Sequence, residues 1–198
     1  MKRKMKNIRK MTMMALVAFS VAIACGCTKP DDPNNGGGGG NSGGGGGGGL
    51  NGHAYVDLGL PSGTLWATCN VGADTPEGYG DYFAWGETQS GSGWCMPTYN
   101  QWRELKVSTN TSWTTQNGVN GRLFTASNGN SLFLPAAGYW GDDELYYVDS
   151  EGSYWSSSLS SEGSDVWIFE FGSNYCGMDE CYLGYGRSVR LVRSSPQN

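Results

Sequence analysis

The sequence predicts an α+β domain that is rich in strands, with long loops and one or two short helices. Three observations favour this class. Short apolar runs of strand length recur between residues 55 and 193, separated by glycine, asparagine and serine. One pair of runs flanks an Asn-Gly turn, the strongest short-range signal for a hairpin. One segment, which begins at Thr98, combines a helix cap with helical spacing of apolar residues.

The first two strands are predicted near the start of this domain. Residues 55–60 alternate between apolar and polar side chains and end at a Pro-Ser-Gly turn, residues 61–63. Residues 65–69 are expected to form the partner strand. Residues 78–86 are aromatic and rich in glycine, which is typical of a loop or a short strand.

The predicted helix starts at Thr98. Gln101 follows three residues later, which is the spacing of a capping box, and Pro97 precedes the cap. Trp102 and Leu105 fall on one face of this helix, and charged residues fall on the other. We expect Trp102 to be an anchor of the core.

The second half of the domain is predicted to be mostly strand. Residues 122–126 and 131–134 flank Ser-Asn-Gly-Asn and predict a hairpin. Three further strand candidates are residues 154–158, 166–171 and 187–193. Apolar residues alternate along the last two candidates, so five side chains are expected to face the core: Val166, Phe169, Phe171, Val189 and Leu191.

The N-terminus predicts export. Residues 1–10 carry six basic side chains and no acid, and an apolar run follows to residue 24. This run is too short for a membrane-spanning helix, which needs about 20 residues. Residues 22–25, Ala-Ile-Ala-Cys, resemble a bacterial lipobox, so residues 1–24 are a predicted signal peptide and Cys25 is the predicted lipid anchor. Cys27 as the anchor, or a plain signal peptide, are the alternatives.

Residues 25–52 predict a lipid anchor followed by a tether. The stretch Lys-Pro-Asp-Asp at residues 29–32 resembles the signal that sends lipoproteins of Bacteroidota to the outer face of the outer membrane. Residues 36–49 are glycine except for Asn41 and Ser42, a composition typical of a flexible coil. We therefore expect a protein in the outer membrane, lipid-anchored and facing the cell exterior, with one globular domain over residues 53–198.

The composition of this domain excludes several function classes. Beyond residue 49 the chain holds six Lys and Arg against sixteen Asp and Glu. That excess of acid argues against nucleic acid as a partner, since no basic stripe could displace phosphate counterions. His53 is the only histidine, so nucleophile–histidine pairs and His-based zinc sites lack a necessary residue. No catalytic residue, metal or cofactor is expected.

Two groups of residues leave alternatives open. Residues 142–151 hold five acids and predict a solvated loop, with a calcium site as the alternative. Four cysteines, Cys69, Cys95, Cys176 and Cys181, follow the signal peptide, and an exported location permits disulfides. Four cysteines allow three connectivities, and the sequence does not choose among them.

Six motifs of the domain resemble one known family. In order, they are YVDLGLPSGTLWATCNVGADTPEGYGDYFAWGET, MPTYNQWREL, WTTQNGVNGRLF, NGNSLFLPAAGY, YWSSSL and GRSVRLVR. Together they resemble the Fibrobacter succinogenes major paralogous domain, which is common in lipoproteins of gut Bacteroidota. The resemblance covers about residues 55–193 and implies a C-type-lectin-like fold, similar to that of formylglycine-generating enzymes. The family's longer stretch before MPT is reduced to residues 89–95, so a ligand site built from it cannot be carried over.

The resemblance also bears on the C-terminal segment. In some such domains, YWSSSL and RSVRLVR bracket a stretch that a diversity-generating retroelement rewrites at asparagine-type codons. This chain has both bracketing motifs. However, Trp167, Met178 and Glu180 cannot arise from an asparagine codon by changes at its two adenines alone. That observation favours the alternative, an ordinary member of the family with a polar loop.

The sequence locates a binding face between these motifs. Residues 174–185 show no strand period and hold three tyrosines and a methionine, so we expect side chains free of packing that could contact a partner. The predicted ligand-binding residues are Trp167, Tyr175, Met178, Asp179, Glu180, Tyr182 and Tyr185.

Two classes of function remain after these exclusions. The leading hypothesis is a receptor or adhesin for a protein or glycan ligand at the cell surface. Calcium-dependent sugar binding is disfavoured, because neither Glu-Pro-Asn nor Gln-Pro-Asp occurs. One alternative is an enzyme of the formylglycine-generating type, whose reactive cysteine pair would be Cys176 and Cys181. Another is a structural subunit of a surface appendage.

Overall fold

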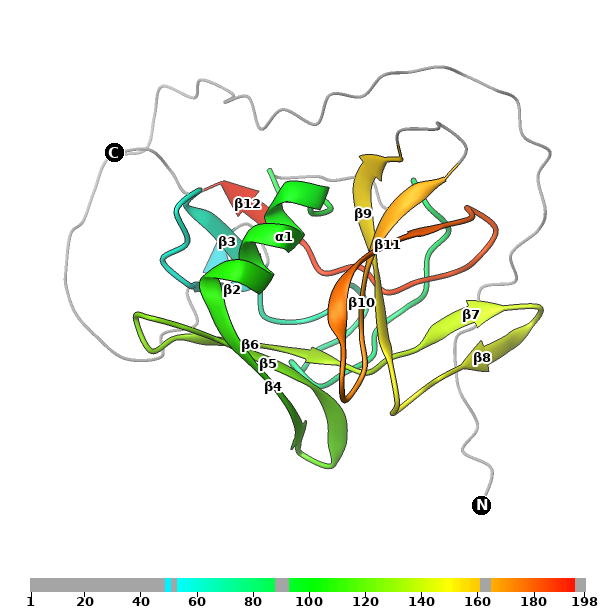
Figure 1. Ribbon diagram of the computed structural model, residues 1–198, viewed down its shortest axis with the longest axis horizontal. Coiled ribbons are helices and arrows are strands. Elements are labelled where there is room, and N and C mark those ends of the chain that lie inside the picture. Colours follow the sequence, from blue (N-terminus) through cyan, green and yellow to red (C-terminus); the bar gives the residue numbers. More distant parts are fainter. Residues whose placement is uncertain (1–48, 51–52, 88–92, 161–164, 195–198) are drawn as a thin grey trace.

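The computed structural model describes residues 49–50, 53–87, 93–160 and 165–194. The predicted signal peptide, the anchor Cys25 and most of the tether lie outside these residues. The described part has one helix and twelve strands in several small sheets, which confirms the predicted strand-rich α+β class (Figure 1).

A four-stranded antiparallel sheet joins the beginning and the end of the domain. Its order is β1 (Gly49–Leu50), β2 (His53–Asp57), β3 (Thr64–Ala67) and β12 (Val192–Ser194). Strands β2 and β3 confirm the first predicted pair, and the N–H of Gly63 closes the turn between them on the carbonyl of Leu60 at 2.8 Å. Strand β1 lies within the range predicted as tether, so regular pairing begins at residue 49.

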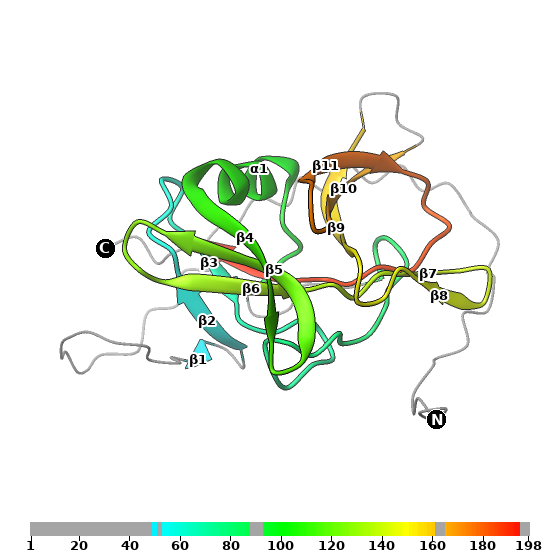
Figure 2. The same ribbon diagram turned by 60° about the horizontal axis from the view of Figure 1, so that its bottom comes forward.

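Helix α1 (Tyr99–Ser108) begins where the capping box predicted it. Thr98 Oγ1 accepts from the N–H of Gln101, and Gln101 Oε1 accepts from the N–H of Thr98. Trp102 and Leu105 are fully buried, so the predicted core anchor is confirmed. Figure 2 shows the helix above the strands formed by residues 109–135 and beside the strands formed by residues 152–181.

The second sheet contains β4 (Thr109–Gln116), β5 (Val119–Ala126) and β6 (Ser131–Pro135). Strands β5 and β6 confirm the predicted hairpin, with Phe124 opposite Leu132. Strand β4 was not predicted, because Trp113 is its only large apolar residue. A second Asn-Gly pair, Asn117 and Gly118, joins β4 to β5, and both residues have positive φ as a type I′ turn requires.

A small hairpin of β7 (Tyr139–Gly141) and β8 (Glu144–Tyr146) occupies the acidic stretch that was predicted to be a solvated loop. Asp142 and Asp143 form its two-residue turn, with φ of 46° and 63°. Aspartate tolerates this left-handed conformation better than most side chains, so an Asp-Asp pair here replaces the usual Asn-Gly.

The third sheet separates two hydrophobic cores. It contains β9 (Gly152–Leu159), β10 (Val166–Phe171) and β11 (Cys176–Cys181), in the antiparallel order β11-β10-β9. Tyr154 and Phe169 on one face belong to the core beneath α1. Trp155 and Ile168 on the other face belong to a second core with Trp94. Strands β9 and β10 confirm two predicted strands, whereas β11 replaces part of the predicted loop.

The predicted strand over residues 187–193 is confirmed only at its end. Residues 187–188 make isolated bridges, including Phe83 with Arg187, and regular pairing starts at Val192. The predicted core residues Val189 and Leu191 are buried, but so is Arg190 between them. Its guanidinium donates to Asn70 Oδ1 and to the carbonyls of Ala67 and Thr68. This segment is buried on all sides, so it lacks the exposed face that an alternating strand would have.

Candidate functional site

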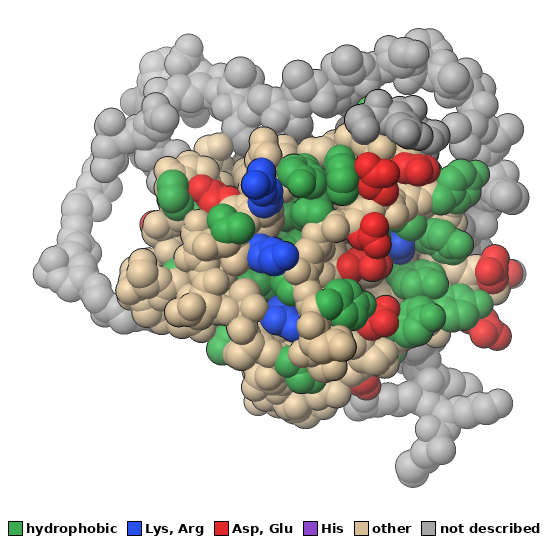
Figure 3. Space-filling model, in the orientation of Figure 1, with side chains coloured by type: hydrophobic (Ala, Val, Ile, Leu, Met, Phe, Trp, Pro, Cys, Tyr) green, Lys and Arg blue, Asp and Glu red, His purple; other side chains and the backbone are tan. Residues whose placement is uncertain are grey.

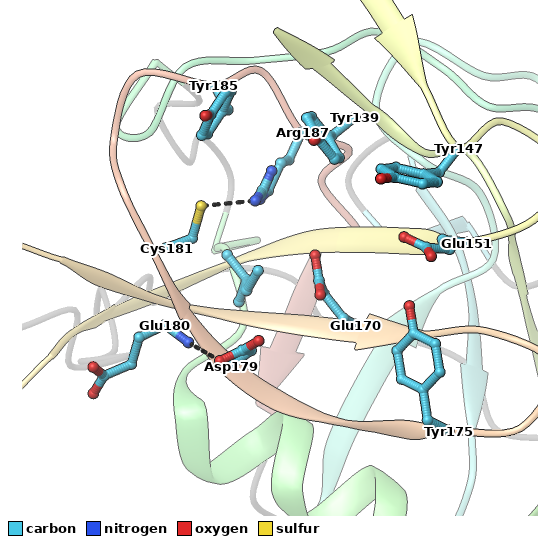
Figure 4. Close-up of a pocket in the computed structure, with 11 residues that line it drawn as sticks. Tyr139, Tyr147, Glu151, Glu170, Tyr175, Asp179, Glu180, Cys181, Tyr185 and Arg187 are labelled. Atoms are coloured by element: carbon cyan, nitrogen blue, oxygen red, sulfur yellow. Dashed lines mark hydrogen bonds between the residues drawn. The ribbon is translucent and has the colours of Figure 1, made fainter.

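A hollow of about 440 Å³ lies where the β9-β10-β11 sheet meets the β7-β8 hairpin (Figure 4). Its walls are rich in tyrosine and carboxylate. The tyrosines are Tyr139, Tyr147, Tyr175 and Tyr185, and the carboxylates nearest the centre are Glu151, Glu170 and Asp179. On the molecular surface, hydrophobic and acidic side chains gather on the same side as β7 and β8 (Figure 3).

The pairing of β10 with β11 divides the predicted binding residues between two faces. Directly opposite residues share a face, and Trp167 pairs with Glu180 while Phe169 pairs with Met178. Phe169 stacks on Trp102 of α1, so this face points toward the helix. Glu180 lines the hollow only near its backbone, since its side chain points away (Figure 4).

Asp179 lies on the opposite face and reaches the hollow. It pairs with Ile168, and its carboxylate accepts from the N–H of Glu180 at 2.8 Å. Tyr175 and Tyr185 also line the hollow, one from the turn before β11 and one from the loop after it. Tyr182 is 67% exposed and lies outside the lining.

The prediction that residues 174–185 are free of packing is wrong for part of this segment. Met178 and Cys176 are half-buried and pack against the core beneath α1. Tyr185 is also half-buried, and its ring meets Tyr139 edge-on at 5.4 Å. The cause is strand β11, because its pairing with β10 turns alternate side chains toward the core. The sequence did not predict this strand, since glycine and acidic residues are uncommon in strands.

Arg122 on β5 orders the turn that carries Tyr175. Its side chain is 7% exposed, and Nη2 donates to the carbonyls of Gly172 and Tyr175 at 2.6 and 3.1 Å. The N–H of Gly172 also donates to the carbonyl of Tyr175. These bonds fix the β10–β11 turn. Arg122 therefore positions Tyr175 at the rim of the hollow, although Arg122 itself does not line the hollow.

Tyr147 reaches the hollow from a strained backbone. Its φ is 58°, in the left-handed region that a bulky aromatic residue rarely adopts. The carbonyl of Tyr147 accepts from the N–H groups of Ser150 and Glu151, which closes a tight turn. That turn presents a tyrosine that is 54% exposed next to Glu151, and strain of this kind concentrates at functional sites.

Arg187 is enclosed at the back of the hollow by aromatic rings. Its guanidinium carbon lies 5.0 Å from the ring centres of Tyr139 and Trp155 and 5.6 Å from that of Tyr185. Nη2 donates to the sulfur of Cys181 at 2.7 Å. The side chain is 3% exposed, and its Nε and Nη1 have no hydrogen-bond acceptor among the described residues.

Glu170 faces the hollow from the penultimate position of β10. It lies opposite Ser153 on β9, whose hydroxyl donates to Glu170 Oε1 at 2.9 Å. Burial raises the pKa of Glu170, and the like charges of Asp179 and Glu151 raise it further, whereas Ser153 and Arg187 act in the opposite direction. Burial also raises the pKa of Tyr175 to about 12, with help from Glu151 and Glu170. The hydroxyl of Tyr175 is therefore a neutral hydrogen-bonding group at physiological pH.

Cys69, Cys176 and Cys181 are free thiols in the described part of the chain. Cys176 and Cys181 stand at opposite ends of β11, about 16 Å apart along an extended strand, whereas a disulfide needs Cα atoms within about 7 Å. Burial raises the pKa of both thiols. Cys176 and Cys181 therefore cannot form a disulfide with each other in this structure.

Several residues of the hollow were not predicted from the sequence. Tyr139, Tyr147 and Glu151 belong to the acidic stretch and its flanks, for which the sequence predicted a solvated loop, with a calcium site as the alternative. Glu170 is the one acid in an otherwise apolar strand, a departure from the apolar pattern that could have identified it. In the part of the chain that the structure describes, no three His, Cys, Asp or Glu side chains are grouped so as to hold a metal ion.

The comparisons with known proteins give one match. Residues 105–192 match a family described as a domain of unknown function (DUF8237). The matched segment runs from α1 to β12 and includes every residue that lines the hollow. Comparison with the curated proteins gave no match, and neither did comparison with the solved structures. Among the described residues, α1 is the only helix, and it is not long enough to cross a membrane.

Proposed function

We propose that this protein is a lipid-anchored receptor or adhesin of the outer membrane that binds a ligand in the tyrosine- and carboxylate-lined hollow. The observation that carries the proposal is the hollow itself. Elements from four parts of the chain bring four tyrosines and three carboxylates to one opening. Tyrosine gives a large contact area at low entropic cost and is common at recognition surfaces.

The proposed ligand class is a protein or glycan at the cell surface, and nucleic acid is not proposed as a partner. The proposed fold is C-type-lectin-like, on the resemblance of the six motifs to the Fibrobacter-type domain. The proposed location rests on the lipobox-like residues before Cys25 and on the acidic signal that follows it. Retroelement diversification would act on the stretch that contains β10 and β11, and its test is a neighbouring reverse transcriptase with a near-copy of this stretch.

Binding is tested with the full-length lipoprotein purified in detergent and applied to arrays of glycans and peptides. We expect a bound class whose signal falls in the Tyr175→Ala variant, because Tyr175 lies at the rim of the hollow. The matched control is Tyr182→Ala, since Tyr182 is exposed but outside the lining. Binding that Tyr182→Ala removes and Tyr175→Ala leaves intact would contradict the proposed site.

The anchor is tested separately by labelling cells with a radioactive fatty acid. We expect Cys25→Ser to abolish labelling and to release the protein from the membrane. The control is Cys27→Ser, which should be labelled like the wild type. Labelling that survives in Cys25→Ser and disappears in Cys27→Ser would move the anchor to Cys27.

A further inference from the structure

The side chains of the hollow carry an excess of negative charge. Glu151, Glu170 and Asp179 surround its centre, and Arg187 is the one cation in the lining that the structure describes (Figure 4). The like charges are close enough to affect one another, because Asp179 and Glu151 both disfavour ionisation of Glu170. A cation bound among them would remove that repulsion. The charge of the lining therefore favours a positively charged ligand group.

The tyrosine rings provide the second half of a cation site. A cation within about 6 Å of a ring centre is attracted by the π face. The protein already uses this interaction at the back of the hollow, where Arg187 lies over the rings of Tyr139 and Tyr185. Tyr147 and Tyr175 are more exposed, and no cation contacts their rings in the described part of the chain. Their faces remain open to a cation from a ligand.

Arg187 indicates what else the ligand carries. Its side chain is 97% buried and lines the hollow, yet Nε and Nη1 have no acceptor among the described residues. The surrounding rings stabilise the charge, but they do not offer these donors a lone pair. A ligand with an oxygen acceptor close to its cation would match both Arg187 and the carboxylates. A polypeptide combines the two, since its backbone carbonyls lie beside its lysine and arginine side chains.

The rim of the hollow is a strand edge that could hold such a polypeptide. Strand β11 is the outermost strand of its sheet, and no described strand pairs with its outer side. The N–H of Glu180 is capped by the side chain of Asp179 and not by another strand. An extended peptide added to this edge would gain main-chain hydrogen bonds. Its alternate side chains would lie on the Asp179 face, toward the hollow.

We propose that the hollow binds a lysine or arginine side chain from an extended basic polypeptide segment that lies along β11. Glu151, Glu170 and Asp179 surround the ammonium or guanidinium group, and the rings of Tyr147 and Tyr175 flank it. The inference rests on the proposed function, because it names the ligand class of the same site. The charge of the domain, with sixteen acidic and six basic residues after residue 49, complements a basic partner.

Calorimetric titration of the full-length lipoprotein with hexalysine tests this inference. The matched probe is the same peptide with every lysine acetylated, which keeps the backbone and removes the charge. We expect acetylation to weaken binding about tenfold or more, because the acetylated side chains lose their charge and with it the charge-assisted hydrogen bonds to the carboxylates. Glu170→Gln and Asp179→Asn should each weaken hexalysine binding by a similar factor. Asp74→Asn removes an exposed acid outside the hollow and should leave the affinity unchanged.

Three results would overturn the inference. Equal binding of the acetylated peptide would show that the cation is not recognised. Equal weakening by Asp74→Asn would show that hexalysine is attracted by the overall charge of the domain. Binding of neutral oligosaccharides that Tyr175→Ala abolishes, without binding of hexalysine, would refute the cationic ligand and leave the proposed binding function intact. Circular dichroism of each variant confirms that the fold is retained.

Discussion

The two faces of the β9-β10-β11 sheet differ, since one packs against helix α1 and the other lines the proposed binding hollow. Toward α1, Phe169 stacks on Trp102 with ring centres 4.6 Å apart and planes 5° apart, and Phe171 is fully buried. On the other face, Ile168 is buried in the second core, but Glu170 on the same strand opens into the hollow. Strand β10 thus contributes aromatic side chains to the core beneath α1 on one face. On its other face it contributes Ile168 to the second core and Glu170 to the charged hollow.

The difference shows how a single strand supports both stability and a site. Period-two alternation sends neighbouring residues to opposite faces, so the core beneath α1 restrains the backbone while the other face carries polar groups. The two buried arginines differ in the same way. Arg122 fixes a turn by hydrogen bonds, whereas Arg187 is held by aromatic rings at the back of the hollow. We therefore expect substitutions on the helix side to affect folding and those in the hollow to affect binding.

The largest effect is expected from Trp102→Ala on the helix side. Truncation of a fully buried tryptophan leaves a large cavity and should destabilise the domain by about 3–5 kcal/mol, measured by urea unfolding. Trp167→Ala on the same face of the sheet is the comparison, because Trp167 is half-buried and its ring meets only the tilted ring of Tyr99 in the described structure. Equal losses of stability in the two variants would contradict this comparison, because they would mean that Trp167 is packed as tightly as Trp102.

Arg122→Met is expected to have the next largest effect. It removes the donor to the carbonyl of Gly172 and one of the two donors to the carbonyl of Tyr175, which should cost about 1–3 kcal/mol. Hydrogen exchange should increase in the β10–β11 turn, and ligand binding should weaken with it because Tyr175 loses its support. Arg103→Met on the exposed face of α1 serves as the control and should change stability by less than about 0.5 kcal/mol. An unchanged exchange rate in the turn would refute the positioning role of Arg122.

Tyr185 and Tyr182 separate packing from exposure within one loop. Tyr185→Ala removes a contact with Tyr139 and a cation–π contact with Arg187, so we expect a loss of about 1–2 kcal/mol. Tyr182→Ala should change stability by at most about 0.5 kcal/mol, since Tyr182 is 67% exposed. Thermal melts of the two variants check this order. If both melt like the wild type, the half-buried position of Tyr185 contributes nothing to folding.

The smallest effect is a pH-dependent gain in Glu170→Gln. Burial raises the pKa of Glu170 above 4.5, so ionised Glu170 destabilises the folded state at neutral pH. This loss of folding stability is complete when the pH is above the raised pKa of Glu170 in the folded state. It disappears when the pH is below the ordinary pKa of glutamate, because the carboxyl group is then protonated in both the folded and the unfolded state. The groups that face it are Ser153, Arg187, Asp179 and Glu151. We expect Glu170→Gln to melt slightly above the wild type at pH 7 and equally at about pH 4.

The control for this pH dependence is Glu180→Gln. It removes the same charge from an exposed side chain that points away from the hollow, so it should show no comparable gain. A Glu170→Gln variant that melts below the wild type at pH 7 would mean that Ser153 and Arg187 stabilise the carboxylate more than burial disfavours it.

Much of the fold could be predicted because its signals are local. The capping box at Thr98 and the apolar spacing of Trp102 and Leu105 are complete within one helix. The β5-β6 hairpin is encoded by a turn and its two flanks. Strands β4 and β11 were missed because their residues are mostly polar, acidic or glycine. Strands β7 and β8 were missed because three residues are too few to show alternation. Such segments become strands only when a partner supplies the hydrogen bonds, and for β11 that partner is β10.

The candidate site was predicted only in part for the same reason. An unusual concentration of tyrosines and acids identified Tyr175, Asp179 and Tyr185 from the sequence, and all three line the hollow. Trp167 and Met178 were assigned to the same binding surface because residues 174–185 were predicted to be a loop and not a strand. Once β11 pairs with β10, alternation places both residues on the helix side.

The sequence by itself determined the α+β class, the helix, the hairpin and the burial of five apolar side chains, those of Val166, Phe169, Phe171, Val189 and Leu191. It did not identify Ile168 and Val192, which are buried as well. Local spacing contains that information, because periods of 3.6 and 2 residues distinguish helix from strand. Only the tertiary structure decided that residues 139–151 approach residues 175–187, and that Arg187 and Arg190 are buried. A buried guanidinium depends on rings and carbonyls supplied by distant segments, so no local pattern could reveal it.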